Sequence, residues 1–208
     1  MLEGRLALIT GAGQGNGRTI ALGLAQAGAR VIVTDLNAST VDETASAIRQ
    51  AGGQAWSYVL DVTQADDCHA LAARVADEVG QVDLLVNNAG IIIRETTSSP
   101  RAAANWKKTI DVNVHGTFNV THAWLDAVKA TRGCVINIAS IAAYAGQAAS
   151  LGYAPSKGAI KMLTQSLAQE LAPAGVRVNA LAPGVIATPM TAATVSYTHL
   201  TLPTICSV

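Results

Sequence analysis

The chain has 208 residues, enough for one domain with a sizeable core, and its 14 Lys and Arg residues balance its 14 Asp and Glu residues. This neutrality argues against nucleic acid or an anionic membrane surface as a partner. Half of the residues are hydrophobic and only 13% are charged, which favours an assembly of several copies that hides part of the surface.

Cysteine and histidine usage indicates neither a disulfide framework nor a metal site. Cys68, Cys134 and Cys206 are odd in number, and the four histidines are scattered without ligand spacing. The first apolar run, Leu6–Ile9, is too short for a membrane span or a signal sequence. We therefore expect a soluble cytoplasmic protein without a bound metal.

Short apolar runs alternate with longer helical stretches along the chain. The runs at 31–33 and 84–86 are apolar at consecutive positions, as in strands buried on both faces of a sheet. This alternation predicts right-handed βαβ units and one doubly wound α/β domain with helices on both faces. Strands are expected at Leu6–Thr10, Arg30–Asp35, Gln54–Asp61, Asp83–Asn87, Gly133–Ala139 and Val176–Ala182, and helices at 17–28, 39–51, 64–79, 102–130 and 152–172.

A glycine-rich turn follows the first expected strand. The strict G-x-G-x-x-G spacing fails because position 16 is Asn, but G-x-x-x-G-x-G fits at Gly11, Gly15 and Gly17. Such glycines let the backbone approach a pyrophosphate, whose charge meets the N–H groups at the start of the next helix. Between the first strand and the first helix, the turn predicts a dinucleotide site.

Asp35 ends the second expected strand. A carboxylate there can accept hydrogen bonds from the adenosine ribose, and it would repel a 2′-phosphate. Neither Leu36 nor Gln14 supplies a positive charge to offset that repulsion. The sequence therefore favours NAD over NADP, the alternative being that Asp35 is an ordinary loop carboxylate.

Tyr153 and Lys157 lie four positions apart in an expected helix, so they project from the same face. The lysine charge there would favour the phenolate form of the tyrosine and suit it to acid–base chemistry. A lone pair of this kind is more often an exposed part of an amphipathic helix. Ser140, thirteen residues earlier, and the glycine turn favour the catalytic interpretation.

Together these residues resemble the short-chain dehydrogenase/reductase family over about residues 4–190. The matching motifs are Thr10–Gly17, Asp61-Val62, Asn87-Asn88-Ala89-Gly90, Asn113, Ser140, Tyr153 with Lys157, and Pro183-Gly184 with Thr188. The resemblance implies a Rossmann fold and a homodimer or homotetramer for the full-length protein. It implies cofactor contacts from Gly11, Gln14, Gly15, Asn16, Asp35, Asp61, Val62, Asn88, Ala89, Gly90, Tyr153, Lys157, Pro183, Gly184, Ile186 and Thr188.

The resemblance also implies catalytic roles. Tyr153 would be the general acid or base, Lys157 would assist it and hold the nicotinamide ribose, and Ser140 would bind the reacting oxygen. Asn113 would hold a water that links Lys157 to solvent, while Asn87 would tie the central strands together. One departure is Asn16, which stands where the family usually carries an aliphatic residue.

The activity we expect is NAD-dependent hydride transfer between the nicotinamide and a secondary alcohol or ketone, such as a polyol or a sugar acid. Two alternatives stay open: an NADP-dependent 3-oxoacyl-thioester reductase, which Asp35 disfavours, and a non-catalytic dinucleotide-binding protein.

The last residues depart from the family pattern. We expect a single NAD(P)-binding domain over residues 1–194, with six strands and without the family's usual seventh. Residues 195–204 match the translation of a transposase-adapter end used in sequencing libraries, so Val195–Val208 is interpreted as a non-native tail. The alternative is a divergent natural C-terminus.

Overall fold

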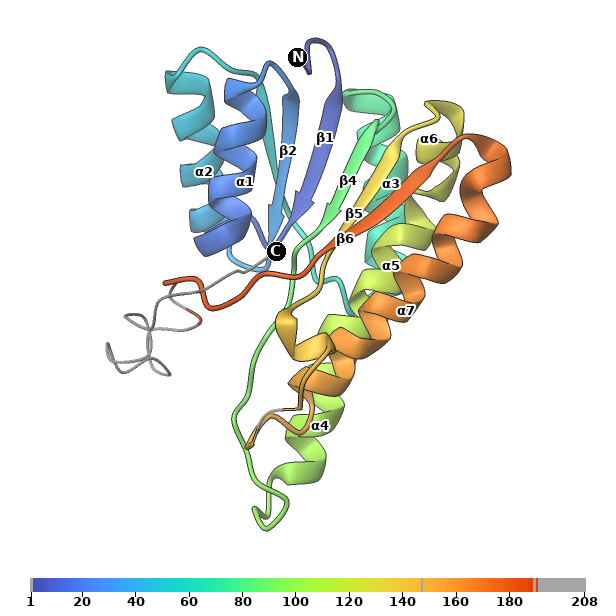
Figure 1. The fold of residues 1–208 in the computed structure, drawn as a ribbon. Helices are drawn as coiled ribbons and strands as arrows, with labels where there is room; N and C mark the ends of the chain where they lie inside the picture. The colour runs from blue at the N-terminus through green and yellow to red at the C-terminus, as the bar shows by residue number, and fades with distance from the viewer. Residues whose placement is uncertain (1, 147, 189, 191–208) are drawn as a thin grey trace, which may run out of the picture.

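The structure is a computed structural model that describes residues 2–146, 148–188 and 190. Six parallel strands form its sheet: β1 (Leu6–Thr10), β2 (Arg30–Asp35), β3 (Ala55–Val59), β4 (Leu84–Asn87), β5 (Cys134–Ile138) and β6 (Arg177–Leu181). Their order is β3-β2-β1-β4-β5-β6, which confirms the predicted doubly wound Rossmann fold (Figure 1). The tail Val195–Val208 and the boundary at residue 194 lie outside the described residues.

Helices cover both faces of the sheet (Figure 1). One face packs against α1 (Gly15–Gln26) and α2 (Ala38–Gln50), and the other against α3 (Ala65–Glu78), α5 (Gly116–Ala123), α6 (Leu125–Ala130) and α7 (Tyr153–Leu171). Both faces of β1 are therefore apolar. Ala7 and Ile9 pack in the core on the side of α1 and α2, and Leu6 and Leu8 pack in the core on the side of α3, α5, α6 and α7.

The prediction of one continuous helix over 102–130 is wrong. It comprises α4 (Ala102–Ile110), a π-helical turn at Asp111–His115, α5 and α6, with a break at the buried Trp124. Hydrophobic periodicity is read over a window of several turns, so the single extra residue of one π turn hardly changes it. The turn matters because it contains Asn113.

β1 and β4 pair in the middle of the sheet, and the order of the strands reverses between them. In open α/β sheets, ligands bind in the crevice beyond the carboxyl ends of the strands at this point. The turns after β1 and β4 meet there, because the Thr10 hydroxyl accepts hydrogen bonds from the backbone N–H groups of Asn88 at 3.1 Å and Ala89 at 3.0 Å.

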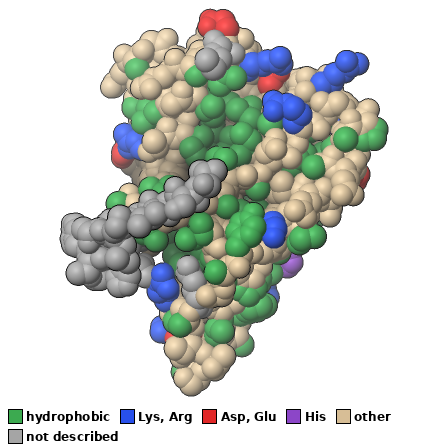
Figure 2. All heavy atoms as spheres, in the orientation of Figure 1, with side chains coloured by type: hydrophobic (Ala, Val, Ile, Leu, Met, Phe, Trp, Pro, Cys, Tyr) green, Lys and Arg blue, Asp and Glu red, His purple; other side chains and the backbone are tan. Residues whose placement is uncertain are grey.

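Part of the sheet surface beside α1 is apolar and half-buried. Leu84, Ile136 and Ile138 contribute to it from β4 and β5, and Leu181 of β6 is 54% exposed. Figure 2 shows the green side chains of this face. Among the residues that the structure describes, no helix is long and apolar enough to cross a membrane.

Candidate active site

The glycine turn has the backbone geometry that its sequence predicts. Gly11 and Gly15 adopt positive φ angles of 62° and 53°. A β-carbon at Gly11 would lie 2.9 Å from Cα of Ala89, and one at Gly17 would overlap the carbonyl oxygen of Gly11. Side chains at these positions would therefore separate the turn from β4 and α1.

The first turn of α1 leaves its backbone N–H groups without a side-chain cap. Gln14, the residue before the helix, makes no capping hydrogen bond, whereas Asn37 caps α2 by accepting from Ser39 and Thr40. Uncapped N–H groups at the positive end of a helix dipole form a binding site for a phosphate anion. This turn thus fits the pyrophosphate of a dinucleotide.

Asn88 fastens the glycine turn to β4. Its side-chain amide donates to the carbonyl oxygens of Thr10 at 2.9 Å and Gly11 at 3.0 Å. Asn87, one residue earlier, reaches the neighbouring strand and donates to Oδ1 of Asn137 at 2.9 Å. Asn88 therefore fixes the glycine turn to the end of β4, and Asn87 links β4 to β5.

Asp35 lies at the end of β2 beside the glycine turn. Its Oδ2 accepts a hydrogen bond from the N–H of Gly13 at 3.0 Å, and its Oδ1 accepts from Asn37 at 3.4 Å. A carboxylate has about four acceptor positions, so these two bonds leave capacity for ribose hydroxyls. The neighbouring Leu36 is 65% exposed and supplies no positive charge.

Asp61 and Val62 line the same end of the cleft after β3. Oδ1 of Asp61 accepts from both the N–H and the hydroxyl of Thr63, at 2.9 and 2.7 Å, which closes a tight turn. The carbonyl of Val62 accepts from Asn119 at 3.0 Å. Val62 is 7% exposed and lines the cleft beside Asp61.

Lys157 is almost completely buried at the other end of the cleft. Its Nζ donates to the carbonyl oxygen of Ile138 at 2.6 Å and lies 5.7 Å from the centroid of the Tyr153 ring. Burial lowers the pKa of Lys157 to about 8, because the charged form loses its hydration. The lysine can therefore change its charge close to neutral pH.

Tyr153 and Ser140 face the cleft with Lys157. Tyr153 begins α7, where Gly152 allows close packing because a β-carbon there would lie 2.9 Å from Cβ of Thr109. The hydroxyl of Tyr153 has no hydrogen-bond partner among the described residues. Ser140 follows β5, and its Oγ accepts from the N–H of Ala142 at 3.1 Å.

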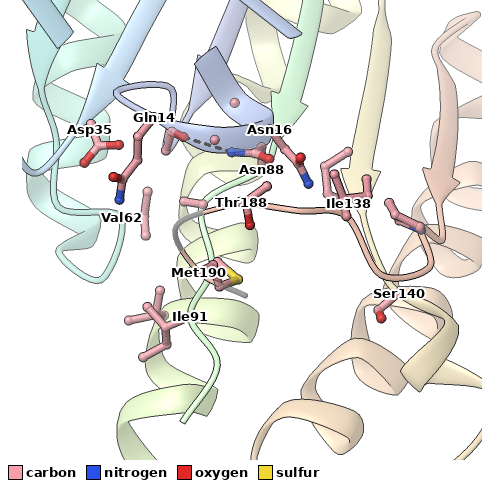
Figure 3. A pocket seen from close by; sticks show the side chains of 18 of the residues that line it. Gln14, Asn16, Asp35, Val62, Asn88, Ile91, Ile138, Ser140, Thr188 and Met190 are labelled. Atoms are coloured by element: carbon pink, nitrogen blue, oxygen red, sulfur yellow. Dashed lines mark hydrogen bonds between the residues drawn. The ribbon is translucent and has the colours of Figure 1, made fainter. Parts of the chain in front are cut away.

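These groups border one cleft of about 300 Å³ (Figure 3). Every residue predicted to contact the cofactor lines it, as does Ser140; Asn113 is buried, does not line the cleft, and bonds to the backbone of Ile91, which does. Pro183, Gly184, Ile186 and Thr188 complete the wall after β6. The sequence did not single out Leu60, Ile91, Val112, Ile138, Ala139 and Met190, apolar lining residues that carry no chemical signal.

The cleft contains no cluster of metal ligands. Within the described residues there is no group of three or more His, Cys, Asp or Glu side chains that could hold a metal ion.

A profile of the family described as short chain dehydrogenase matches residues 5–198. The chain is 38% identical over 191 residues to a 3-oxoacyl-(acyl-carrier-protein) reductase, FabG, of Thermotoga maritima, a match that covers 91% of this chain and 77% of the relative. It is 35% identical over 192 residues to a cyclopentanol dehydrogenase of Comamonas sp., covering 90% and 75% of the two chains.

A solved structure shares the fold closely. The crystal structure of a candidate NAD(P)-dependent gluconate 5-dehydrogenase of Beutenbergia cavernae, with NADP bound at low occupancy, gives a TM-score of 0.86 at 39% identity. The superposition covers 92% of this chain and 76% of that one.

Proposed function

The chain belongs to the short-chain dehydrogenase/reductase family of oxidoreductases, and we propose that it transfers hydride between NAD and a small secondary alcohol or ketone. The observation that carries the proposal is the shared cleft. Tyr153, Lys157 and Ser140 line one end of it, and the uncapped helix α1 and Asp35 line the other. Proton-transfer groups thus lie at the end of a dinucleotide site.

The cofactor would supply the hydride acceptor or donor, and the chain would manage the proton and the developing charge. For alcohol oxidation, the Tyr153 phenolate removes the hydroxyl proton while Ser140 donates a hydrogen bond to the same oxygen. The Lys157 ammonium, held against the Ile138 carbonyl, stabilises the phenolate charge and binds the ribose. In reduction, Tyr153 returns the proton to the carbonyl oxygen.

The side chain of Asn113 is already used within the protein, in bonds to Ile91 and Ser156. We infer that any water it holds for the proton relay is bound by its backbone carbonyl, which also accepts from the Thr117 hydroxyl at 2.9 Å. The π turn at Asp111–His115 frees backbone carbonyls from the regular α-helical pattern, which supports this role.

The preference for NAD rests on Asp35. A 2′-phosphate beside this carboxylate would bring like charges together, and none of the described residues that line this part of the cleft has a cationic side chain. The Beutenbergia cavernae structure holds NADP, so the test is direct: steady-state rates with each cofactor across a range of concentrations. Higher kcat/KM for NADPH than for NADH would overturn the preference.

For the substrate we propose a polyol or a sugar acid. The similarity to a candidate gluconate 5-dehydrogenase supports this choice, while the similarity to FabG supports the alternative, a 3-oxoacyl thioester. A panel of gluconate, other sugar acids, polyols, cyclopentanol and a 3-oxoacyl thioester, assayed by nicotinamide absorbance, tests it. Turnover of the thioester alone would favour the reductase.

Assembly as a homodimer or homotetramer is a further prediction. Half-buried apolar side chains on the sheet and exposed ones such as Trp106, Phe118 and Met162 support it. Light scattering coupled to gel filtration measures it, and a monomeric mass at assay concentration would contradict it.

A further inference from the structure

Ser156 joins two parts of the site that are far apart in the sequence. Its Oγ accepts a hydrogen bond from Nδ2 of Asn113 at 2.9 Å and donates one to the carbonyl oxygen of Tyr153 at 2.7 Å. Ser156 is fully buried, and Asn113 is 1% exposed. The hydroxyl therefore connects the π turn to the first turn of α7 without competition from water.

The Asn113 side chain has a second partner, the backbone of Ile91. Its Oδ1 accepts from the Ile91 N–H at 2.8 Å, and its Nδ2 donates to the Ile91 carbonyl at 3.0 Å. Both N–H bonds of the amide are thus in use, one toward Ile91 and one toward Ser156. Ile91 lines the cleft, so a continuous chain of hydrogen bonds runs from the cleft wall to Tyr153.

We propose that Ser156 is a positioning residue that sets the depth and orientation of Tyr153 relative to Lys157 through this chain. The inference rests on the proposed role of Tyr153 as the acid–base group. Lys157 is held independently by the Ile138 carbonyl of β5, whereas Tyr153 sits at the helix start, where backbone bonds are fewest. A bond that fixes the Tyr153 backbone therefore controls how close its phenol lies to the ammonium.

Removing the Ser156 hydroxyl has a definite physical consequence. In Ser156→Ala, one N–H of Asn113 stays buried without an acceptor, and the α7 start loses its link to the π turn. The start of α7 can then shift, and the phenolate of Tyr153 moves away from the charge that stabilises it. Lys157 and the glycine turn keep all of their own contacts.

Ser150 provides a matched control. It is 1% exposed, lies three residues before Tyr153, and its Oγ has no hydrogen-bond partner among the described residues. Ser150→Ala deletes the same atom from a buried position nearby without breaking a hydrogen bond. An effect seen in Ser156→Ala but not in Ser150→Ala is therefore due to the lost hydrogen bonds of Ser156 and not to the loss of a buried oxygen atom.

The experiment compares wild type, S156A, S150A and Tyr153→Phe. We expect S156A to lower kcat for alcohol oxidation by tenfold or more with the NAD dissociation constant changed less than twofold. We also expect its pH of half-maximal kcat to move upward by about half a unit or more, because the phenolate is stabilised less. S150A should match wild type in all three measurements.

A second readout does not need the cofactor. The ultraviolet absorbance of phenolate, recorded against pH for the free protein and corrected with Y153F, should show a higher midpoint for Tyr153 in S156A than in wild type. In the double variant of Asn113→Ala and S156A, the loss of kcat should be smaller than the product of the two single losses, since both substitutions break the same chain of hydrogen bonds. If S156A does not fold, Ser156→Cys, which keeps a weak donor, takes its place.

The two hypotheses fail in different ways. Normal kcat, an unchanged pH profile and an unchanged phenolate midpoint in S156A, with Y153F inactive, would overturn the role of Ser156 alone. A drop in kcat with both pH readouts unchanged would reduce Ser156 to a purely structural residue and would also contradict the inference. Full activity in Y153F would instead overturn the proposed function.

Discussion

The ammonium nitrogen of Lys157 lies 2.6 Å from the carbonyl oxygen of Ile138, at the carboxyl end of β5. Only 5% of the lysine is exposed, and burial lowers its pKa to about 8 from the ordinary value of 10.5. The native protein thus holds a cation that water would solvate better, in the position where the proposed chemistry needs it.

The buried ammonium is expected to reduce stability near neutral pH. Between pH 8 and 10.5 the unfolded chain binds this proton more tightly than the native protein does, so the free energy of unfolding rises with pH across that interval. Below pH 8 the lysine is charged in both states, and the native protein bears the whole destabilisation from burying the charge. Lys157→Met should therefore raise the free energy of unfolding at pH 7 by about 1–2 kcal/mol while abolishing activity. Urea unfolding at pH 7 and pH 10 measures this.

The exposed Lys129 is a control for that substitution, and Lys129→Met should change stability little at either pH. The advantage of Lys157→Met should shrink as the pH rises toward 10. A Lys157→Met protein less stable than wild type at pH 7 would contradict the argument.

NAD affinity should depend on the charge of Lys157. If the ammonium donates to the ribose, the dissociation constant for NAD should rise roughly three- to tenfold as the pH passes through the lysine pKa of about 8. Fluorescence titration of NAD binding from pH 6.5 to 9.5 checks this. Lys157→Met should bind NAD more weakly at low pH and show a flat profile, and an equally steep profile in that variant would exclude Lys157 as the source.

Tyr153→Phe should separate catalysis from binding. Loss of the hydroxyl removes the proposed proton-transfer group, so kcat should fall by about 10³-fold or more, while NAD affinity should change less than threefold. Tyr144→Phe is the control, because Tyr144 is 67% exposed and does not line the cleft. Loss of NAD binding together with turnover would indicate a structural role for Tyr153.

Cofactor preference should be reversible at the end of β2. Asp35→Ser combined with Leu36→Arg removes the repelling carboxylate and adds a cation for the 2′-phosphate, so the ratio of kcat/KM for NADP to that for NAD should rise by about 10²-fold or more. Leu36→Arg alone keeps Asp35 and should shift the ratio much less. An unchanged ratio in the double variant would mean that residues other than Asp35 and Leu36 determine the preference between NAD and NADP.

Two glycines of α1 should respond oppositely to alanine. A β-carbon at Gly17 would overlap the Gly11 carbonyl, so Gly17→Ala should weaken NAD binding by tenfold or more and lower the melting temperature. Gly23 has no atom within 4 Å of its β-carbon position, so Gly23→Ala should add about 0.5–1 kcal/mol of stability without changing affinity. Equal behaviour of the two variants would contradict the steric argument.

Much of the fold was predictable because its signals are local. Each strand falls within one of the predicted short apolar runs, and Gly28 and Gly52 follow the ends of α1 and α2 with φ angles of 96° and 87°. The glycine turn and the Tyr153–Lys157 spacing are also local patterns. Each of them can be seen within a few residues of sequence.

The π turn and the role of Ser156 could not be predicted in this way. Asn113 bonds to Ile91, 22 residues earlier, and to Ser156, 43 residues later, and neither partner has a pattern that marks it. Likewise, the apolar lining residues Ile91, Val112 and Ile138 reach the cleft from three separate elements. Their chemistry is that of core residues, and only their position makes them part of a site.

The sequence by itself therefore determined the element types, the doubly wound class, the glycine turn and the Tyr153–Lys157 spacing, since periodicity and spacing act within one element. The tertiary structure decided the strand order, the π turn at Asp111–His115, and the contacts that hold Tyr153 beside a buried Lys157. The physical reason is that hydrogen bonds and burial depend on which distant segments pack together. A parallel sheet brings those segments to one edge only when the whole chain has folded.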